Sequence, residues 1–224
     1  VLEVETPLLV NAGVTDVNLR PVALRLGERE MFLHTSPEYA MKRLLAAGSG
    51  DIYQICRVVR GDERSALQNP EFTLLEWYRL GMSMEALIVE VASLLDALAA
   101  AAGRRARPLV HKTYREACCE MLQIDPLECT DAALRERAIR EGLDRHSAES
   151  LARDGLLDFL VGSVIGPQLG RGDWLALTHY PASQAALATL DPLDPRVALR
   201  FEIYADGVEL ANGGHKARRA RDKP

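Results

Sequence analysis

Two alternating stretches around a polar loop, within residues 51–79, constrain this chain most. In the first stretch, alternate residues fall on one side of a strand, namely Ile52, Gln54, Cys56, Val58 and Arg60. The same spacing in the second stretch joins Phe72, Leu74, Glu76 and Tyr78. The segment between them, Gly61 to Asn69, is too long for a two-residue turn. The pattern predicts a long antiparallel hairpin with an arginine, an aromatic ring, a carboxylate and a phenol on one surface.

Each of these groups also has a purely structural explanation. Arg60 fits a solvated charge at a strand end, Glu76 fits its cross-strand partner, and Phe72 fits a core position. Taken together they suit a different purpose, because arginine forms a fork for phosphate or carboxylate and a ring offers a stacking surface for a base. The acid and the phenol suit an ammonium group. The set favours a pocket for a nucleotide beside an amino acid.

A second hairpin carries a pair of acids. Residues 197–204 and 208–212 flank Asp206-Gly207, a favoured two-residue turn. The resulting register puts Glu202 and Glu209 on the same face. Surface alternation alone produces such a pair, but like charges on one face repel each other unless a cation lies between them. A magnesium ion on ATP phosphates is the sharper interpretation.

The remaining pattern predicts helices between short strands. A serine cap at Ser36 followed by Pro37 predicts a helix that ends at Gly48. Further helices are expected over 83–102, 113–122, 130–141 and 147–160. Strands are expected over 1–7, at a sheet edge, and over 32–34 and 174–178.

Composition narrows the class of protein. A chain of 224 residues that is 48% apolar can bury one sizeable core and is most simply one domain. A net charge of −5 argues against a large nucleic-acid surface. No run reaches the roughly 18 apolar residues of a membrane helix. The 4 cysteines form no C-x-x-C pair, which favours reduced thiols and a cytoplasmic location.

Several blocks carry a family resemblance. Arg60 to Glu63, Asn69 to Thr73 and Glu76 to Tyr78 together resemble the second signature motif of class II aminoacyl-tRNA synthetases in its lysyl form. Three further blocks narrow the likeness, and they are 35–39, 41–48 and 209–213. The chain resembles the elongation factor P–lysine ligase family, a paralogue of lysyl-tRNA synthetase that modifies a translation factor. The likeness covers roughly residues 1–213.

The resemblance implies an α+β fold, with a class II synthetase-like antiparallel sheet flanked by helices and incomplete. It implies a catalytic domain over 1–213 with a helical insertion at about 104–172, followed by a basic tail over 214–224 that is disordered or out of frame. It also implies that the chain is truncated at both ends, so that it lacks its natural start and the third class II motif. The family forms homodimers.

The resemblance also implies the reaction and its residues. ATP, with Mg²⁺, would activate lysine or β-lysine as an adenylate, and the acyl group would pass to elongation factor P. Arg60 would be catalytic, gripping the α-phosphate and the substrate carboxylate. The implied ATP-binding residues are Arg60, Asp62, Glu63, Gln68, Asn69, Phe72, Glu209 and Leu210. The implied substrate-binding residues are Ser36, Pro37, Glu38, Glu76, Tyr78 and Asn212. The implied metal ligands are Glu202 and Glu209. These groups are expected to line a single cavity.

Two departures keep alternatives open. Gln68 stands where the family usually has histidine, and Lys216 stands where a glutamate is expected to bind the substrate ammonium. With the third motif missing, poor ATP binding and little or no ligase activity are expected of the chain as written. The first alternative is the catalytic core of a lysyl-tRNA synthetase, for which tRNA would be the partner. The second is a non-catalytic paralogue that only binds a partner.

Overall fold

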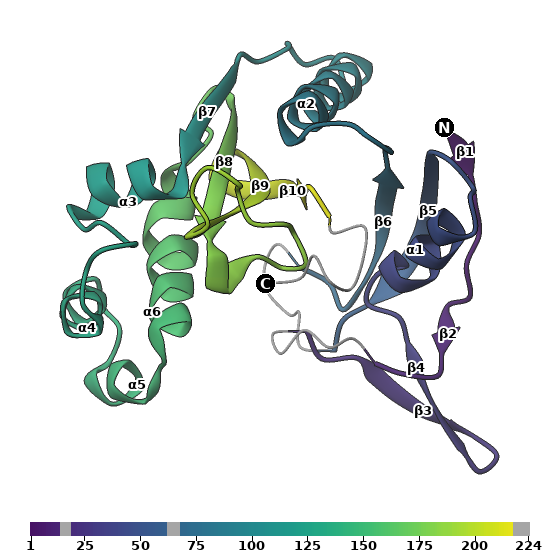
Figure 1. The fold of residues 1–224 in the computed structure, drawn as a ribbon, viewed down its shortest axis with the longest axis horizontal. Helices are drawn as coiled ribbons and strands as arrows, with labels where there is room; N and C mark the ends of the chain where they lie inside the picture. The colour runs from purple at the N-terminus through teal and green to yellow at the C-terminus, as the bar shows by residue number, and fades with distance from the viewer. Residues whose placement is uncertain (14–18, 62–67, 217–224) are drawn as a thin grey trace. The chain divides into compact units, whose positions relative to one another are not determined.

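The computed structural model describes residues 1–13, 19–61 and 68–216. The chain forms two compact units, Val1–Met82 and Ser83–Pro224. Each unit is described by itself below, and Figure 1 gives the labels of its elements.

The first unit contains two small sheets and one helix. One sheet has the strand order β1-β5-β6, and the other has the order β2-β4-β3. The elements are β1 (Leu2–Glu3), β2 (Leu9–Val10), β3 (Val22–Leu26), β4 (Arg29–Leu33), α1 (Glu38–Ala46), β5 (Ile52–Val59) and β6 (Glu71–Tyr78). β1 runs parallel to β5 at the sheet edge, and the other pairings of this unit are antiparallel. The edge strand predicted over 1–7 is therefore confirmed only at Leu2–Glu3, since residues 4–7 are not part of a strand.

The hairpin predicted within residues 51–79 is confirmed as β5 and β6. Gln54 pairs with Glu76, and Val58 pairs with Phe72, so the even-numbered residues of both strands share a face. Burial separates the two faces, since Gln54 and Val58 are buried whereas Ile55, on the other face, is 57% exposed. The alternation read from the sequence therefore reports which side of the hairpin faces inward.

The second unit is built on a four-stranded sheet with the order β10-β9-β8-β7. Its strands are β7 (Leu109–Thr113), β8 (Trp174–Pro181), β9 (Val197–Ala205) and β10 (Val208–Gly214). Its helices are α2 (Met84–Ala101), α3 (Tyr114–Leu122), α4 (Asp131–Arg140), α5 (Arg145–Ser150) and α6 (Arg153–Leu160), followed by the short turns η1 (Val161–Ile165), η2 (Gly166–Gln168) and η3 (Ala182–Gln184). β7 is parallel to β8, whereas β8 pairs with β9 and β9 with β10 in antiparallel fashion.

The two faces of this sheet are covered by different helices. Leu175 and Leu177 of β8 belong to the main core, to which α3 and α6 contribute most of the helical residues. Alternate residues of a strand point to opposite faces, so Trp174 points the other way. There its indole Nε1 donates to Asp96 Oδ1 of α2 at 2.8 Å. The sheet is thus enclosed between α2 and the α3–α6 group.

The starts of α2, α3 and α4 follow the predicted caps. Ser83 and Thr130 accept hydrogen bonds from the third residue of α2 and α4, and Thr113 forms a reciprocal capping box with Glu116.

Two expectations were wrong. Pro37, not Ser36, occupies the cap position of α1, which begins at Glu38, although Ser36 Oγ still accepts from the Glu38 N–H. Residues 147–160 were also predicted as a single helix. Two helices, α5 and α6, lie there instead, separated by Leu151 in an extended conformation with ψ 136°.

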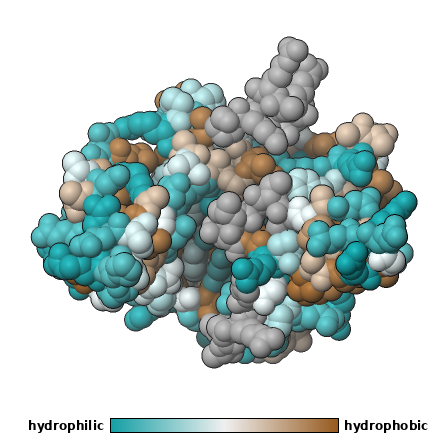
Figure 2. Space-filling view, turned by 90° about the horizontal axis from the view of Figure 1, so that it is seen from below, coloured by the Kyte–Doolittle hydropathy of each residue, from teal (hydrophilic) through white to brown (hydrophobic). Residues whose placement is uncertain are grey.

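Helices α3 to α6 all fall within the predicted helical insertion at about 104–172. Figure 2 shows that the surface over α4 and α5 is largely hydrophilic. Across the described ranges, none of the helices is both long enough and apolar enough to cross a bilayer. The limits of the predicted catalytic domain, 1–213, stay a prediction.

Candidate functional site

The first unit brings a cation and an aromatic ring together at the end of the β5–β6 hairpin. Arg60 directly follows β5, and its backbone N–H donates to the carbonyl oxygen of Pro70 at 2.8 Å. Its guanidinium carbon lies 5.0 Å from the centroid of the Phe72 ring, within the range of a cation–π contact. Its Nε donates to the carbonyl oxygen of Thr35 at 3.2 Å. Arg60 is thereby tied to the segment that leads into α1.

Beside that segment lies a cluster of an acid and two hydroxyls. Ser36 Oγ donates to Glu76 Oε2 at 2.5 Å, and the Tyr78 hydroxyl donates to Glu76 Oε1 at 2.6 Å. The backbone N–H of Glu38, the first residue of α1, donates to Ser36 Oγ at 3.0 Å. The Glu38 carboxylate pairs with Lys42 one turn further along α1, at 2.7 Å. Loop, helix start and strand therefore converge on Glu76.

The electrostatics of this cluster are dominated by negative charge. Burial, together with the nearby Glu76 and Glu38 carboxylates, raises the pKa of the Tyr78 phenol far above its ordinary value. Tyr78 is therefore a neutral hydrogen-bond donor at any working pH. The Glu76 carboxylate, oriented by two hydroxyl donors, forms an arrangement that attracts an ammonium group, and Glu38 adds a second carboxylate nearby that pairs with Lys42. The structure thus brings together Ser36, Glu38, Glu76 and Tyr78, with the buried Pro37 between the first two.

The second unit holds the predicted acid pair on the β9–β10 hairpin. Tyr204 pairs with Glu209 and Glu202 pairs with Asn212, across the Asp206-Gly207 turn that the sequence indicated. The register shifts between Glu209 and Ala211, which places a bulge at Leu210. Asn212 Nδ2 donates to Glu209 Oε1 at 2.9 Å. These residues of β10 are exposed, with Leu210 at 47%.

Glu202 lies in a different environment, since it is only 7% exposed. Its Oε1 accepts from Arg200 Nη2 at 2.6 Å, and its Oε2 accepts from the Tyr204 hydroxyl at 2.6 Å. Burial and the Glu202 charge together raise the pKa of the Tyr204 and Tyr180 phenols above their ordinary value. Sequence reasoning missed Arg200 and Tyr180 as neighbours of this acid. The alternation of Arg200, Glu202 and Tyr204 along one face of β9 is the signal that points to Arg200, whereas Tyr180 lies on β8 and has no such signal.

The donors of this acid pair fit Mg²⁺ in chemical type, because both Glu202 and Glu209 offer hard carboxylate oxygens. In the described ranges no group of three or more His, Cys, Asp or Glu side chains is arranged to hold a metal. Two protein carboxylates with the remaining ligands from phosphate oxygens and water are nonetheless the usual set for Mg²⁺ on a nucleotide.

The other predicted site residues are placed as follows. Gln68 and Asn69 are exposed just before β6, and Asp62 and Glu63 lie outside the described residues. Lys216 Nζ donates to the carbonyl oxygen of Ala186 at 2.9 Å. Gly214 ends β10, and the His215 N–H donates to the Leu199 carbonyl at 2.8 Å. The predicted single cavity would join residues of both units and stays a prediction.

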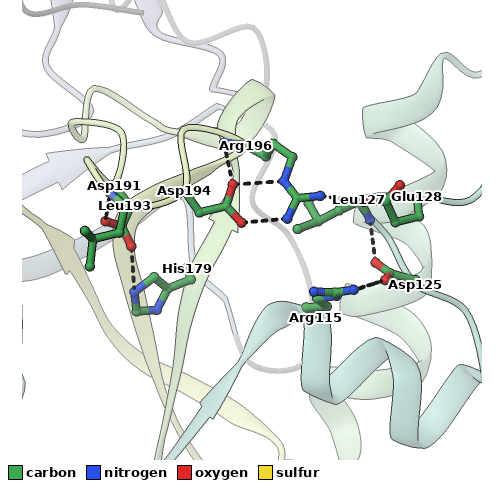
Figure 3. Close-up of polar contacts among 9 residues, drawn as sticks. All are labelled: Arg115, Asp125, Leu127, Glu128, His179, Asp191, Leu193, Asp194 and Arg196. Atoms are coloured by element: carbon green, nitrogen blue, oxygen red, sulfur yellow. Dashed lines mark hydrogen bonds and ion pairs between the residues drawn. The ribbon is translucent and has the colours of Figure 1, made fainter.

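A cluster of ion pairs in the second unit was not predicted from the sequence (Figure 3). Arg196, just before β9, binds Asp194 through two nitrogens, at 2.9 and 2.8 Å, and also contacts Glu128. Two nitrogens of Arg115, in α3, donate to a single oxygen of Asp125, Oδ2, at 2.8 and 2.5 Å. These side chains are largely exposed, and exposed pairs contribute little to stability. The cluster contains none of the predicted site residues.

Comparison with known proteins agrees with the fold and the motifs. The family described as tRNA synthetases class II (D, K and N) matches residues 1–223. The predicted class of fold, α+β with a class II synthetase-like sheet, is therefore confirmed.

Individual relatives narrow the family further. An elongation factor P–(R)-β-lysine ligase of Erwinia tasmaniensis is 44% identical, over 100% of this chain and 69% of its own length. The Klebsiella pneumoniae protein of the same name is 42% identical over the same shares. That of Pasteurella multocida is 44% identical, over 96% of this chain and 66% of its own length. The chain belongs to the elongation factor P–(R)-β-lysine ligase family of class II synthetases, a family of ATP-dependent ligases.

Proposed function

We propose that this protein activates a lysine-type amino acid with ATP and transfers it to a lysine of elongation factor P. In the first step a carboxylate oxygen of the amino acid attacks the α-phosphorus of ATP, the bond to the β-phosphate oxygen breaks, and pyrophosphate leaves. In the second step a lysine amine of elongation factor P attacks the acyl carbon, an amide forms, and AMP and a proton are released. The protein's part is to position two anions and neutralise their charge.

One observation carries the proposal, which is the link between Arg60 and the acid cluster. The Arg60 guanidinium is tied to Thr35, and the next residue, Ser36, donates to Glu76. A free amino acid has a carboxylate and an ammonium a few ångströms apart, and this part of the first unit offers a cation for one and carboxylates for the other. Phe72, beside Arg60, offers the stacking face for adenine.

The remaining role, holding the metal ion, belongs to the acids of the second unit. Glu202 and Glu209 would hold Mg²⁺, which when bound neutralises charge on the ATP phosphates. Asn212, bonded to Glu209, would add a polar contact to the substrate. A catalytic domain over 1–213, a homodimer and a cytoplasmic location complete the proposal, together with Asp62, Glu63, Gln68, Asn69 and Leu210 as nucleotide contacts.

The binding step is tested by calorimetry with the sulfamoyl analogues of α- and β-lysyl adenylate. Replacing Glu76 by Gln removes the charge that faces the ammonium, and loss of a buried charge partner costs about 2–5 kcal/mol. We therefore expect E76Q to weaken binding at least about 30-fold. Glu71→Gln is the matched control, because Glu71 is exposed on the opposite face of the same strand and pairs loosely with Arg57 at 3.9 Å.

Equal binding by wild type and E76Q would remove the assignment of the ammonium site. No heat from the wild type with either analogue would favour the non-catalytic alternative. The expectation that the 224-residue chain has little pyrophosphate exchange activity stays a prediction, so binding is measured in parallel with exchange.

The acceptor is tested separately from activation, because the matching family is described as tRNA synthetases. Chemically prepared β-lysyl adenylate is supplied with elongation factor P or with tRNA. We expect protein-dependent labelling of elongation factor P, abolished when its acceptor lysine is replaced. Labelling of tRNA alone would establish the alternative, a lysyl-tRNA synthetase core.

A further inference from the structure

The side chain of Arg200 is held from three directions. Its Nη2 donates to Glu202 Oε1 at 2.6 Å, and its Nη1 donates to the carbonyl oxygen of Gln184 at 2.7 Å. Its guanidinium carbon lies 4.2 Å from the centroid of the Tyr180 ring, a cation–π contact with a residue that is 3% exposed. A planar guanidinium with two bonded nitrogens and a stacked face has one orientation. Arg200 can therefore hold the Glu202 carboxylate in one position.

The segment that anchors Arg200 is itself anchored. Gln184 Nε2 donates to Asp158 Oδ1 at 2.8 Å, and Ser183 Oγ donates to Asp154 Oδ1 at 2.7 Å. Both aspartates belong to α6, one helical turn apart. The orientation of Arg200 therefore depends, through this segment, on α6, a helix of the main core.

The carboxylate of Glu202 is held at both ends but not saturated. One oxygen accepts from Arg200 and the other from the Tyr204 hydroxyl. A carboxylate has about four lone-pair sites, so these two hydrogen bonds, with the Tyr180 hydroxyl also close to Glu202, leave at least one site open. A charge that is 7% exposed is costly without a partner of opposite sign, and Arg200 supplies that partner.

We propose that Arg200 is a positioning residue for the metal site, and that the Tyr204 hydroxyl supports it by binding the other oxygen of Glu202. Arg200 holds the Glu202 carboxylate in one orientation, so that the remaining lone pairs are presented to a divalent cation. Hydrogen bonds that orient a ligating carboxylate change metal affinity by about 10- to 100-fold when they are removed. The inference deepens the proposed function and rests on it, because the metal role of Glu202 belongs to that proposal.

A purely structural ion pair makes a different prediction. If Arg200 only stabilised the fold, its loss would lower the unfolding midpoint without changing metal affinity in the fraction that stays folded. If it positions Glu202, metal affinity falls even in variants whose fold is intact. Affinity and stability must therefore be measured on the same samples.

The test titrates Mn²⁺ into the full chain with α,β-methylene-ATP, and free Mn²⁺ is followed by electron paramagnetic resonance. Arg200→Met removes the charge and the hydrogen bonds, whereas Arg200→Lys keeps the charge without the fork. Arg196→Met is the matched control, since Arg196 lies in the same part of the chain and binds Asp194 and Glu128 instead (Figure 3). Circular dichroism and urea midpoints monitor the fold.

We expect R200M to raise the Mn²⁺ dissociation constant about 10- to 100-fold, R200K to recover part of that loss, and R196M to match the wild type. Unchanged Mn²⁺ affinity in R200M, or an equal loss in R196M, overturns the inference.

Glu202→Gln distinguishes a failure of the role proposed for Arg200 from a failure of the proposed function. If E202Q weakens Mn²⁺ binding and R200M does not, only the role of Arg200 falls. If the wild type binds neither the nucleotide analogue nor Mn²⁺, the proposed function falls and the role of Arg200 falls with it.

Discussion

Tyr78→Phe is the most direct test of the acid–hydroxyl cluster in the first unit. The substitution keeps the ring and removes the hydroxyl that donates to Glu76 Oε1 at 2.6 Å. A hydrogen bond to a charged group contributes about 1.5–3 kcal/mol, so the variant should lower the free energy of unfolding of the first unit by about that amount. Substrate affinity should fall as well, because Glu76 loses one of the two hydroxyls that orient it.

The matched control is Tyr53→Phe on the neighbouring strand. Tyr53 also donates to a glutamate, Glu3, but at 3.1 Å and on the exposed surface. An exposed contact of this length competes with water, so no measurable loss of stability is expected. The comparison isolates burial and charge, since both variants remove one phenolic hydroxyl from the same sheet.

The assay is urea unfolding at pH 7 followed by tryptophan fluorescence. The chain has 2 tryptophans, and replacing Trp174 by Phe in every variant leaves Trp77 of β6 as the reporter of the first unit. A double-mutant cycle with Ser36→Ala adds a second reading. Because Ser36 and Tyr78 bond the same carboxylate, we expect a coupling energy of about 0.5–3 kcal/mol. A loss in Y78F no greater than that in Y53F, or strict additivity with S36A, would refute the reasoning.

Two further predictions concern stability in the second unit and at high pH. Gly170→Ala should lower the free energy of unfolding clearly more than Gly172→Ala. Both glycines have a left-handed φ, which destabilises an alanine by about 1–2 kcal/mol. A Cβ at Gly170 would also lie 2.4 Å from the Tyr204 carbonyl oxygen, whereas a Cβ at Gly172 would have no atom within 4 Å. Equal unfolding midpoints for the two variants would contradict the close approach. Burial raises the pKa of Tyr78, Tyr180 and Tyr204 in the folded protein. Their contribution to the free energy of unfolding is therefore fully present below the ordinary pKa of 10.0. It is lost as the pH rises above that value, because the unfolded chain then releases protons that the folded chain keeps. Urea unfolding between pH 8 and 11 should show stability nearly constant well below pH 10 and, above it, a fall that approaches about 1.4 kcal/mol per pH unit for each such tyrosine, with a shallower fall in Y78F; a flat profile up to pH 11 would contradict it.

The elements that the sequence predicted are those specified by local chemistry. The β5–β6 and β9–β10 hairpins follow from alternation and, for the second, from Asp206-Gly207. Ser83, Thr113 and Thr130 marked helix starts because a side-chain oxygen there replaces a missing backbone partner. Such signals need only a few neighbouring residues.

What escaped prediction depends on contacts between distant segments. The parallel pairing of β1 with β5 joins residues about fifty positions apart, and nothing local in a two-residue strand specifies it. The break at Leu151 contains neither glycine nor proline, so the apolar pattern of residues 147–160 continues through it. Tertiary packing decided both.

The candidate site divides along the same line. Glu76 and Tyr78 could be placed on one face from alternation, and the family motif supplied their proposed roles. The dependence of Glu202 on Arg200 could not be anticipated, because the orientation of Arg200 is set by Gln184 and Tyr180, which come from another part of the chain.

The bulge at Leu210 has a consequence for how this hairpin tolerates change. Glu209 and Asn212 are three positions apart, a separation that sends side chains to opposite sides of an unbroken strand, yet here they are hydrogen-bonded to each other. Because Leu210 is an extra residue without a partner on β9, Glu209 and Asn212 point to the same side of the strand. The fold should therefore tolerate replacement of residue 210, and even its deletion would leave Glu209, Ala211 and Asn212 opposite Tyr204, Ile203 and Glu202 in a regular strand, with the amide and the carboxylate still on one side.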